Sequence, residues 1–182
     1  MGGEIPPEIG KHADIQHWDV APGPAYFQEL ARVSRNQIIW GGNYFDLPPT
    51  RCFVVWDKKQ PENFSMAMCE YAWTSFNDNA KVVYLQPQGR PGERFHPTQK
   101  PVALYAWILE KYAKPGMRIL DTHAGSGSLE VACMARGLDC WGFEIDPYYH
   151  QKATERIRQE SMQVTLLDVQ KEIEIEQQTL FD

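Results

Sequence analysis

Residues 118–133 read Arg118-Ile-Leu-Asp-Thr-His-Ala-Gly-Ser-Gly-Ser-Leu-Glu-Val-Ala-Cys133, and this stretch decides the fold class. An apolar run ends at Asp121, a turn of small residues follows over 124–128, and apolar residues then recur at helical spacing. This order predicts a strand, a tight glycine turn and the start of a helix, the first strand–helix unit of a nucleotide-type cofactor site. Glycines in the turn permit positive φ and let a ligand approach the backbone.

A second expected strand covers 138–145 and brings two carboxylates, Glu144 and Asp146, to its end. They follow the first strand by about twenty residues, the separation at which a carboxylate can bind ribose hydroxyls. The turn has neither a G-x-G-x-x-G pattern nor the lysine of a P-loop. A turn that only packs a helix against a sheet is the alternative, and the acidic end of the second strand favours the cofactor site.

Length and composition predict one folded domain over residues 1–182, because 182 residues with 43% hydrophobic content can bury a single core. No apolar run of about eighteen residues and no secretory signal is visible, so we expect a cytoplasmic protein without a membrane span. The four cysteines form no C-x-x-C pair, which predicts reduced thiols and no metal site. The net charge of −6 argues against a general polyanion binder.

Short apolar runs alternate with helical patterns along the rest of the chain. We expect strands at 36–40, 51–56 and 80–85, helices at 25–33, 101–113 and 147–159, and a helix or strand at 66–74. This alternation favours an α/β fold with a doubly wound, mostly parallel sheet. Residues 1–20 are expected to be irregular, and 163–182 form a charged C-terminal tail.

Three further segments precede the glycine turn in a fixed order. They are Asn36-Gln-Ile-Ile-Trp-Gly-Gly-Asn-Tyr-Phe45, then Val55-Trp-Asp-Lys58 with Glu70-Tyr-Ala-Trp-Thr-Ser75, then His96-Pro-Thr-Gln-Lys-Pro101. With the D-x-x-x-G-S-G turn, they resemble the DNA amino-methyltransferases, which methylate adenine N6 or cytosine N4 using S-adenosyl-L-methionine. The likeness covers residues 18–160 and is nearest to the permuted subgroup whose catalytic half precedes the cofactor half. The overall resemblance favours site-specific methylation of adenine N6 in duplex DNA, by a restriction-modification enzyme of bacterial or phage type.

The resemblance implies a fold of S-adenosylmethionine-dependent methyltransferase type and assigns its cofactor pocket by position. The residues expected around the cofactor are Asp121, Thr122, His123, Gly125, Ser126, Gly127, Glu144, His96, Thr98 and Lys100. Among these, Glu144 would hold the ribose hydroxyls, and His96, Thr98 and Lys100 would lie against the methionine end. We also expect Thr98 to cap the helix that follows it.

Contacts to DNA are expected from two places. Asn43 and Tyr44 follow a strand end, where clefts form in α/β folds. Residues 77–95 form a short target-recognition segment that includes Arg90 and Arg94, because arginine reads guanine edges. A polar surface loop is the alternative for this segment.

The chain departs from the family where the target amine is bound. The family uses Asp, Asn or Ser followed by Pro-Pro and an aromatic residue, whereas the Pro-Pro upstream of Asn36 reads Ile5-Pro6-Pro7-Glu8. Pro6 and Pro7 are therefore degenerate candidates, and no catalytic residue is assigned. We expect the fold to lack one or more N-terminal strands, either in a truncated or degenerate copy or with a partner chain supplying them. Little or no methylation by the chain alone should result.

The terminus Gln177-Gln-Thr-Leu-Phe181 resembles the Q-x-x-L-F peptide that docks bacterial proteins on the replication sliding clamp. Gln177, Leu180 and Phe181 would carry that contact, unless Leu180 and Phe181 pack on their own domain. The alternative function is thus a non-catalytic protein of this fold that binds DNA or the clamp. A methyltransferase for a small molecule or protein is a weaker interpretation, and the sequence leaves a homodimer open.

Overall fold

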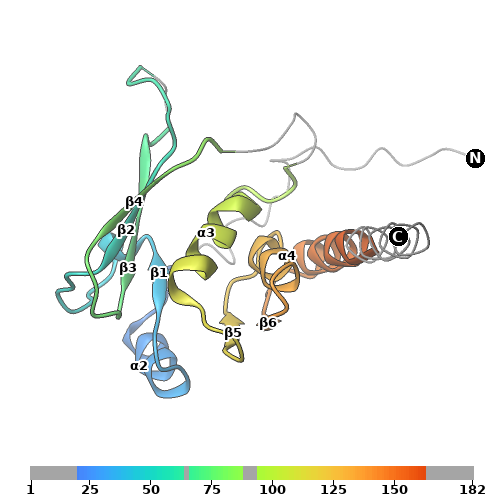
Figure 1. The fold of residues 1–182 in the computed structure, drawn as a ribbon, viewed down its shortest axis with the longest axis horizontal. Coiled ribbons are helices and arrows are strands. Elements are labelled where there is room, and N and C mark those ends of the chain that lie inside the picture. The colour runs from blue at the N-terminus through green and yellow to red at the C-terminus, as the bar shows by residue number, and fades with distance from the viewer. Residues whose placement is uncertain (1–19, 64–65, 88–93, 163–182) are drawn as a thin grey trace, which may run out of the picture. The chain divides into compact units, whose positions relative to one another are not determined.

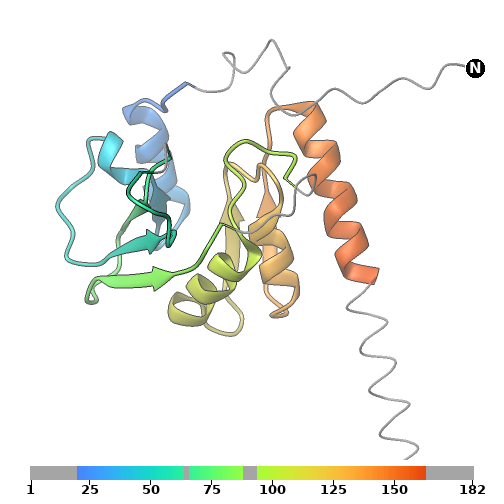
Figure 2. The same cartoon turned by 90° about the horizontal axis from the view of Figure 1, so that it is seen from above.

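The computed structural model describes residues 20–63, 66–87 and 94–162, which divide between two compact units. Of the described residues, 20–63 and 66–87 form the four-strand unit, and 94–162 form the turn unit. Both units contain helices and strands (Figures 1 and 2), so the α/β fold class is confirmed. A single domain over residues 1–182 stays a prediction.

The four-strand unit is built on one mixed sheet, drawn from blue to green in Figure 1. Its strands are β1 (Ile38–Trp40), β2 (Phe53–Asp57), β3 (Cys69–Thr74) and β4 (Lys81–Tyr84), in the order β1-β3-β2-β4. β3 runs antiparallel to both β1 and β2, and β2 pairs with β4 in parallel. Helix α2 (Pro24–Val33) precedes β1, and the short 3-10 helix η1 (Gly42–Tyr44) follows it.

Alternating burial along β2 explains how this sheet forms a core. Val54 and Trp56 are buried while their neighbours in the strand are partly exposed, as expected for a strand with one face on a core. The indole Nε1 of Trp56 donates a hydrogen bond to the Leu85 carbonyl oxygen over 2.6 Å. The buried Thr74 hydroxyl donates to the Cys52 carbonyl oxygen, also over 2.6 Å, so these two polar groups are paired inside the unit.

The turn unit contains α3 (Val102–Tyr112), β5 (Arg118–Asp121), α4 (Ser128–Met134), β6 (Asp139–Gly142) and a helix over residues 147–162. β5 and β6 pair in parallel, from Arg118 opposite Asp139 to Asp121 opposite Gly142. Helix α4 lies beside α3 (Figure 1) and also contacts β5 and β6. Leu109, Ala132 and Cys133 form a buried cluster, against which Ile119 of β5 and Cys140 of β6 pack.

The local patterns predicted most of these elements. The ambiguous segment 66–74 contains a strand, β3, and the helix predicted at 147–159 extends to residue 162. β6 ends at Gly142, so Glu144 lies two residues beyond the strand instead of at its end. Thr98 does not cap α3, because Pro101 is the N-cap and no side chain caps that end. In the described part of the chain, no helix has the length and apolar character needed to span a membrane.

Candidate cofactor site

The glycine turn lies between β5 and α4, and backbone hydrogen bonds hold its conformation. Gly125 and Gly127 have φ values of +52° and +71°, a conformation that disfavours other residues. The Gly127 amide donates to the Ala124 carbonyl over 2.8 Å, and the Val131 amide donates to the Gly127 carbonyl over 3.1 Å. The turn therefore leads directly into α4, as the sequence predicted.

Glu144 joins this turn to the start of the next helix. Its Oε2 accepts a hydrogen bond from the Gly125 amide at 2.8 Å, and its Oε1 accepts one from the Asp146 amide at 2.9 Å. In turn, Asp146 Oδ1 accepts from the amides of Tyr148 and Tyr149, at 2.8 and 3.2 Å, and so caps the helix over 147–162. A carboxylate has about four lone-pair sites, so Glu144 retains acceptor capacity for further hydroxyl donors.

Asp121 ends β5 and supports the same turn. Its Oδ1 accepts a hydrogen bond from the His123 amide at 3.0 Å, and its carbonyl accepts one from the Phe143 amide at 2.8 Å. The Ala124 amide returns a bond to the Phe143 carbonyl at 2.9 Å. Burial raises the pKa of Asp121, and the bond from His123 opposes that rise.

His96 is buried against the turn. Its imidazole packs edge-to-face with Tyr149, with ring centroids 4.4 Å apart. Burial lowers the pKa of His96, the nearby Glu144 carboxylate opposes this, and the Lys100 ammonium adds to it. His96 Nδ1 accepts a hydrogen bond from the Thr98 amide at 3.3 Å, so the neutral ring carries its proton on Nε2.

The turn unit thus brings together the residues that the sequence predicted for a cofactor. Thr98 contacts the His96 ring through its hydroxyl as well, at 3.2 Å, and Thr122 contacts His123 at 3.1 Å. Lys100 lies within electrostatic range of both His96 and Asp121. Their assignment as cofactor contacts stays a prediction.

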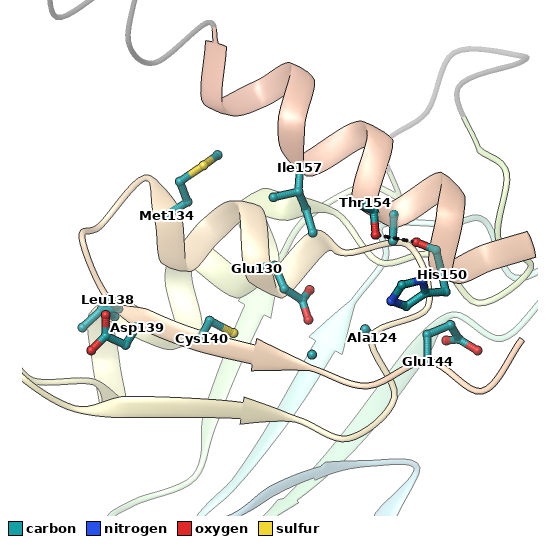
Figure 3. A pocket seen from close by; sticks show the side chains of 12 residues that line it. Ala124, Glu130, Met134, Leu138, Asp139, Cys140, Glu144, His150, Thr154 and Ile157 are labelled. Carbon is teal, nitrogen blue, oxygen red and sulfur yellow. Dashed lines mark hydrogen bonds between the residues drawn. The ribbon is translucent and has the colours of Figure 1, made fainter. Parts of the chain in front are cut away.

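A cavity of about 500 Å³ adjoins this site, between α4, β6 and the helix over 147–162 (Figure 3). Glu144 and His150 lie at one end, and Leu138 and Asp139 lie at the other. Two residues of the site also line this cavity: Ala124 of the turn, and Glu144, which bonds to the turn.

Glu130 projects from α4 toward β6 in the same view (Figure 3). Both of its carboxyl oxygens are buried without a hydrogen-bond partner. Burial, with help from the Asp121 charge, raises the pKa of Glu130 to about 7. Gly142 makes room for this carboxyl group, because a Cβ there would lie 2.1 Å from Glu130 Oε1.

The residues predicted to contact DNA have different surroundings. Asn43 and Tyr44 belong to η1 in the four-strand unit, and Tyr44 is 83% exposed. In the turn unit, Arg94 Nη2 donates to the carbonyls of Pro97 and Gln99, at 3.2 and 3.4 Å, so its guanidinium braces the loop before α3. Arg90, Pro6, Pro7, Gln177, Leu180 and Phe181 lie outside the described residues.

Sequence reasoning missed three residues around the turn. Arg156 binds it, Tyr149 packs on His96, and Glu130 lies on the helix that follows it. The helix that carries Tyr149 and Arg156 was itself predicted, at 147–159, and Pro147 is favoured at its first position. No comparable signal identifies Arg156 or Glu130, whose contacts depend on how helices meet. Among the residues that the structure describes, no three His, Cys, Asp or Glu side chains group as metal ligands do.

Curated relatives of this chain include two bacterial proteins. YubD from Escherichia coli (strain K12), a putative methylase, is 38% identical over 66 residues, which cover 36% of this chain and 29% of YubD. The type II methyltransferase M.HpaI from Haemophilus parainfluenzae is 37% identical over 65 residues, covering 36% of this chain and 21% of that enzyme. The matches therefore span less than a third of either relative.

Solved structures to which this chain is similar include two complexes with S-adenosyl-L-methionine. The crystal structure of the M1.HpyAVI–SAM complex has 25% sequence identity and a TM-score of 0.46, covering 72% of this chain and 68% of the other. The Thermus thermophilus protein TTHA0409, complexed with S-adenosyl-L-methionine, has 20% identity and a TM-score of 0.40, covering 59% of this chain and 52% of the other.

The family model N6_N4_Mtase, described as DNA methylase, matches residues 31–155. That range includes the segments 36–45, 55–58 and 96–101, the glycine turn and Glu144. It is more than half of the chain and includes strands of both units. The chain accordingly belongs to the N6_N4_Mtase family of DNA methylases.

Proposed function

We propose that this chain binds S-adenosyl-L-methionine at the glycine turn and serves the methylation of an exocyclic base amine in duplex DNA, with adenine N6 as the target. The main observation behind this proposal is the hydrogen bond between Glu144 and the Gly125 amide, which lies beside the end of β5. Family membership and the methyltransferase M.HpaI among its relatives support the reaction class.

The residues around the turn suit this cofactor. Gly125 leaves a space beside the His96 ring that a Cβ would narrow to 3.2 Å. The acceptor capacity left on Glu144 suits a pair of ribose hydroxyls. When bound, the cofactor would supply a methyl group already activated by its sulfonium, so these residues need to orient it more than to move protons.

The assignment to adenine rests on the overall resemblance, and cytosine N4 is the other target that the family offers. The target amine needs hydrogen-bond acceptors and a stacking face, because its base must leave the duplex to be reached. The two Pro-Pro steps in these 182 residues are preceded by Ile5 and Leu47, whose side chains cannot accept a hydrogen bond, and neither step is followed by an aromatic residue. We therefore expect little or no turnover from these residues alone.

Titration calorimetry with S-adenosyl-L-methionine and its demethylated product tests the cofactor site. We expect the wild-type chain to bind and Glu144→Gln to bind about tenfold to a hundredfold more weakly, since a hydrogen bond to a charged group contributes about 1.5–3 kcal/mol. Glu110→Gln is the matched control, because that carboxylate is exposed on α3 and pairs with Lys111 at the surface.

A folded wild-type chain that binds neither compound would remove the proposal. Radiolabelled methyl transfer to unmethylated duplex DNA then tests the reaction, and digestion to nucleosides separates N6-methyladenine from N4-methylcytosine. Methylcytosine as the product would overturn the adenine assignment while leaving the cofactor site intact.

A further inference from the structure

Arg156 ties the helix over 147–162 to the glycine turn. Its Nη1 donates hydrogen bonds to the Ser126 carbonyl and to the Ser128 hydroxyl, both at 3.0 Å. Ser126 and Ser128 are buried, and their hydroxyls lie 3.0 Å apart. The guanidinium therefore contacts both residues that flank Gly127, the N-cap of α4.

The same helix packs directly against Gly127. A Cβ at Gly127 would lie 3.1 Å from Ile157 Cδ1 and 3.3 Å from the Ala153 Cβ. Ala153, Arg156 and Ile157 have the three- and four-residue spacing of one helical face. This face therefore supports the turn through both apolar contact and hydrogen bonds.

These contacts fix the peptide group between Ser126 and Gly127 at both ends. Its carbonyl accepts from Arg156, and its amide donates to the Ala124 carbonyl at 2.8 Å. A peptide group is planar, so holding both ends sets the orientation of the whole group. Rotation of this peptide would change φ at Gly127, which is +71°.

We propose that Arg156 is a positioning residue for the cofactor turn, which keeps the Ser126–Gly127 peptide in the orientation that admits S-adenosyl-L-methionine. The inference rests on the proposed function for its ligand. Arg156 itself acts through the backbone of the turn and needs no contact with the cofactor. Both bonds leave from Nη1, so an ammonium has enough donors for them, but the lysine side chain is shorter than that of arginine and should replace it only in part.

The test compares Arg156→Gln, Arg156→Lys and the control Arg158→Gln, which changes an exposed arginine on the same helix. We expect Arg156→Gln to weaken binding of the demethylated cofactor about tenfold, Arg156→Lys to weaken it less, and Arg158→Gln to leave it unchanged. Ser128→Ala removes one acceptor and should weaken binding mildly, with a smaller additional effect in the Arg156→Gln background.

Amide hydrogen exchange separates positioning from a general loss of stability. Positioning predicts faster exchange at residues 125–128 in Arg156→Gln, with unchanged exchange in α3 and β5. Arg156→Gln with normal cofactor affinity and normal exchange at the turn would overturn the inference. Faster exchange throughout the unit, in step with a lower melting temperature, would also overturn it.

The two proposals can fail separately. Absence of cofactor binding by the wild-type chain would refute the proposed ligand, and exchange at residues 125–128 would still decide whether Arg156 holds the turn. If Arg156→Gln does not fold, Arg156→Lys and Ser128→Ala supply the same comparison, and unchanged affinity and turn exchange in both would refute the role.

Discussion

Gly125 shows how closely the turn is fitted to the groups around it. Its amide donates to Glu144, its φ is +52°, and its open side faces the ring of His96. A methyl group at this position would meet the imidazole at 3.2–3.4 Å, closer than ordinary contact. The glycine is thus required by backbone conformation and by space together.

Gly125→Ala should therefore abolish measurable cofactor binding. Gly116→Ala provides the matched control, because Gly116 also has a positive φ, +79°, but open space where a Cβ would lie. Both variants should lose about 1 kcal/mol of unfolding free energy from backbone strain. Calorimetry should show lost affinity only for Gly125→Ala, and equal affinity in the two variants would contradict the close fit to His96.

Glu130 should make the unfolding free energy depend on pH. Its pKa of about 7 in the folded state lies above the ordinary value of 4.5, so between these values the folded chain holds a proton that the unfolded chain has released. The contribution of this group to the unfolding free energy is largest below pH 4.5. It falls as the pH rises from 4.5 to about 7, and it stays constant above that. His96 contributes the opposite slope, because its folded-state pKa is lowered.

Glu130→Gln removes this contribution, including its interaction with the Asp121 charge, and leaves His96 the same in both proteins. From pH 5 to pH 8 the wild type should lose up to roughly 3 kcal/mol relative to Glu130→Gln, at about 1.4 kcal/mol per pKa unit. Urea unfolding at the two pH values measures this difference. Glu110→Gln serves as the exposed control, and parallel pH profiles for wild type and Glu130→Gln would show that the carboxyl group is solvated.

At the scale of elements, β2 and β3 are joined by an ion pair as well as by their ladder. Lys58 follows β2, and its Nζ lies 2.9 Å from Glu70 Oε1 in β3. The Lys58 side chain is only 9% exposed, and its ammonium also lies 5.2 Å from the centre of the Trp56 ring. A cation this deeply buried depends on its carboxylate partner.

Glu70→Gln should cost roughly 2 kcal/mol of unfolding free energy, less than the 3–5 kcal/mol typical of fully buried pairs because Glu70 is partly exposed. The double variant Lys58→Met/Glu70→Gln should regain most of this loss, because no uncompensated charge remains. Glu29→Gln breaks an exposed pair with Arg32 on α2 and should change little. Denaturant unfolding of the four proteins checks the order, and a double variant less stable than Glu70→Gln would contradict it.

Local patterns predicted individual elements well. The order of β5, turn, α4 and β6 followed from one apolar run, two glycines and a helical spacing. The antiparallel direction of β3 could not be predicted this way, because strand direction depends on distant pairing. The contacts of Arg156 and the unpaired carboxyl of Glu130 arise similarly, from residues far apart in sequence. In the candidate site, the sequence predicted the residues of the turn and the carboxylate after β6. It did not predict the helix residues that pack against them or bond to them.

For the molecule as a whole, the proposed contact with DNA has to be reconciled with a net charge of −6. Broad attraction to phosphates would require a basic surface, so binding should depend on a few specific contacts. Tyr44 lies in η1, which contacts β3, and its side chain is 83% exposed. It therefore offers an accessible ring on which a base can stack.

Tyr44→Ala should weaken binding to duplex DNA by about fivefold to a hundredfold, the effect of losing about 1–3 kcal/mol of base stacking. Tyr84→Ala is the matched control, because Tyr84 is also exposed, at 62%, but lies on β4. Fluorescence anisotropy at fixed salt concentration measures both affinities. Equal losses in the two variants would refute a specific role for Tyr44.

Nearly every residue in the short segment from Gly142 to Pro147 makes a specific contact, so its length is fixed. Gly142 accommodates Glu130, Phe143 bonds to both Asp121 and Ala124, Glu144 bonds to Gly125, and Asp146 caps the helix that begins at 147. One inserted residue would displace every later partner by about 3.5 Å. In a library of random single-codon insertions, variants that still bind the cofactor should therefore carry insertions in this segment less often than in the loop after β2.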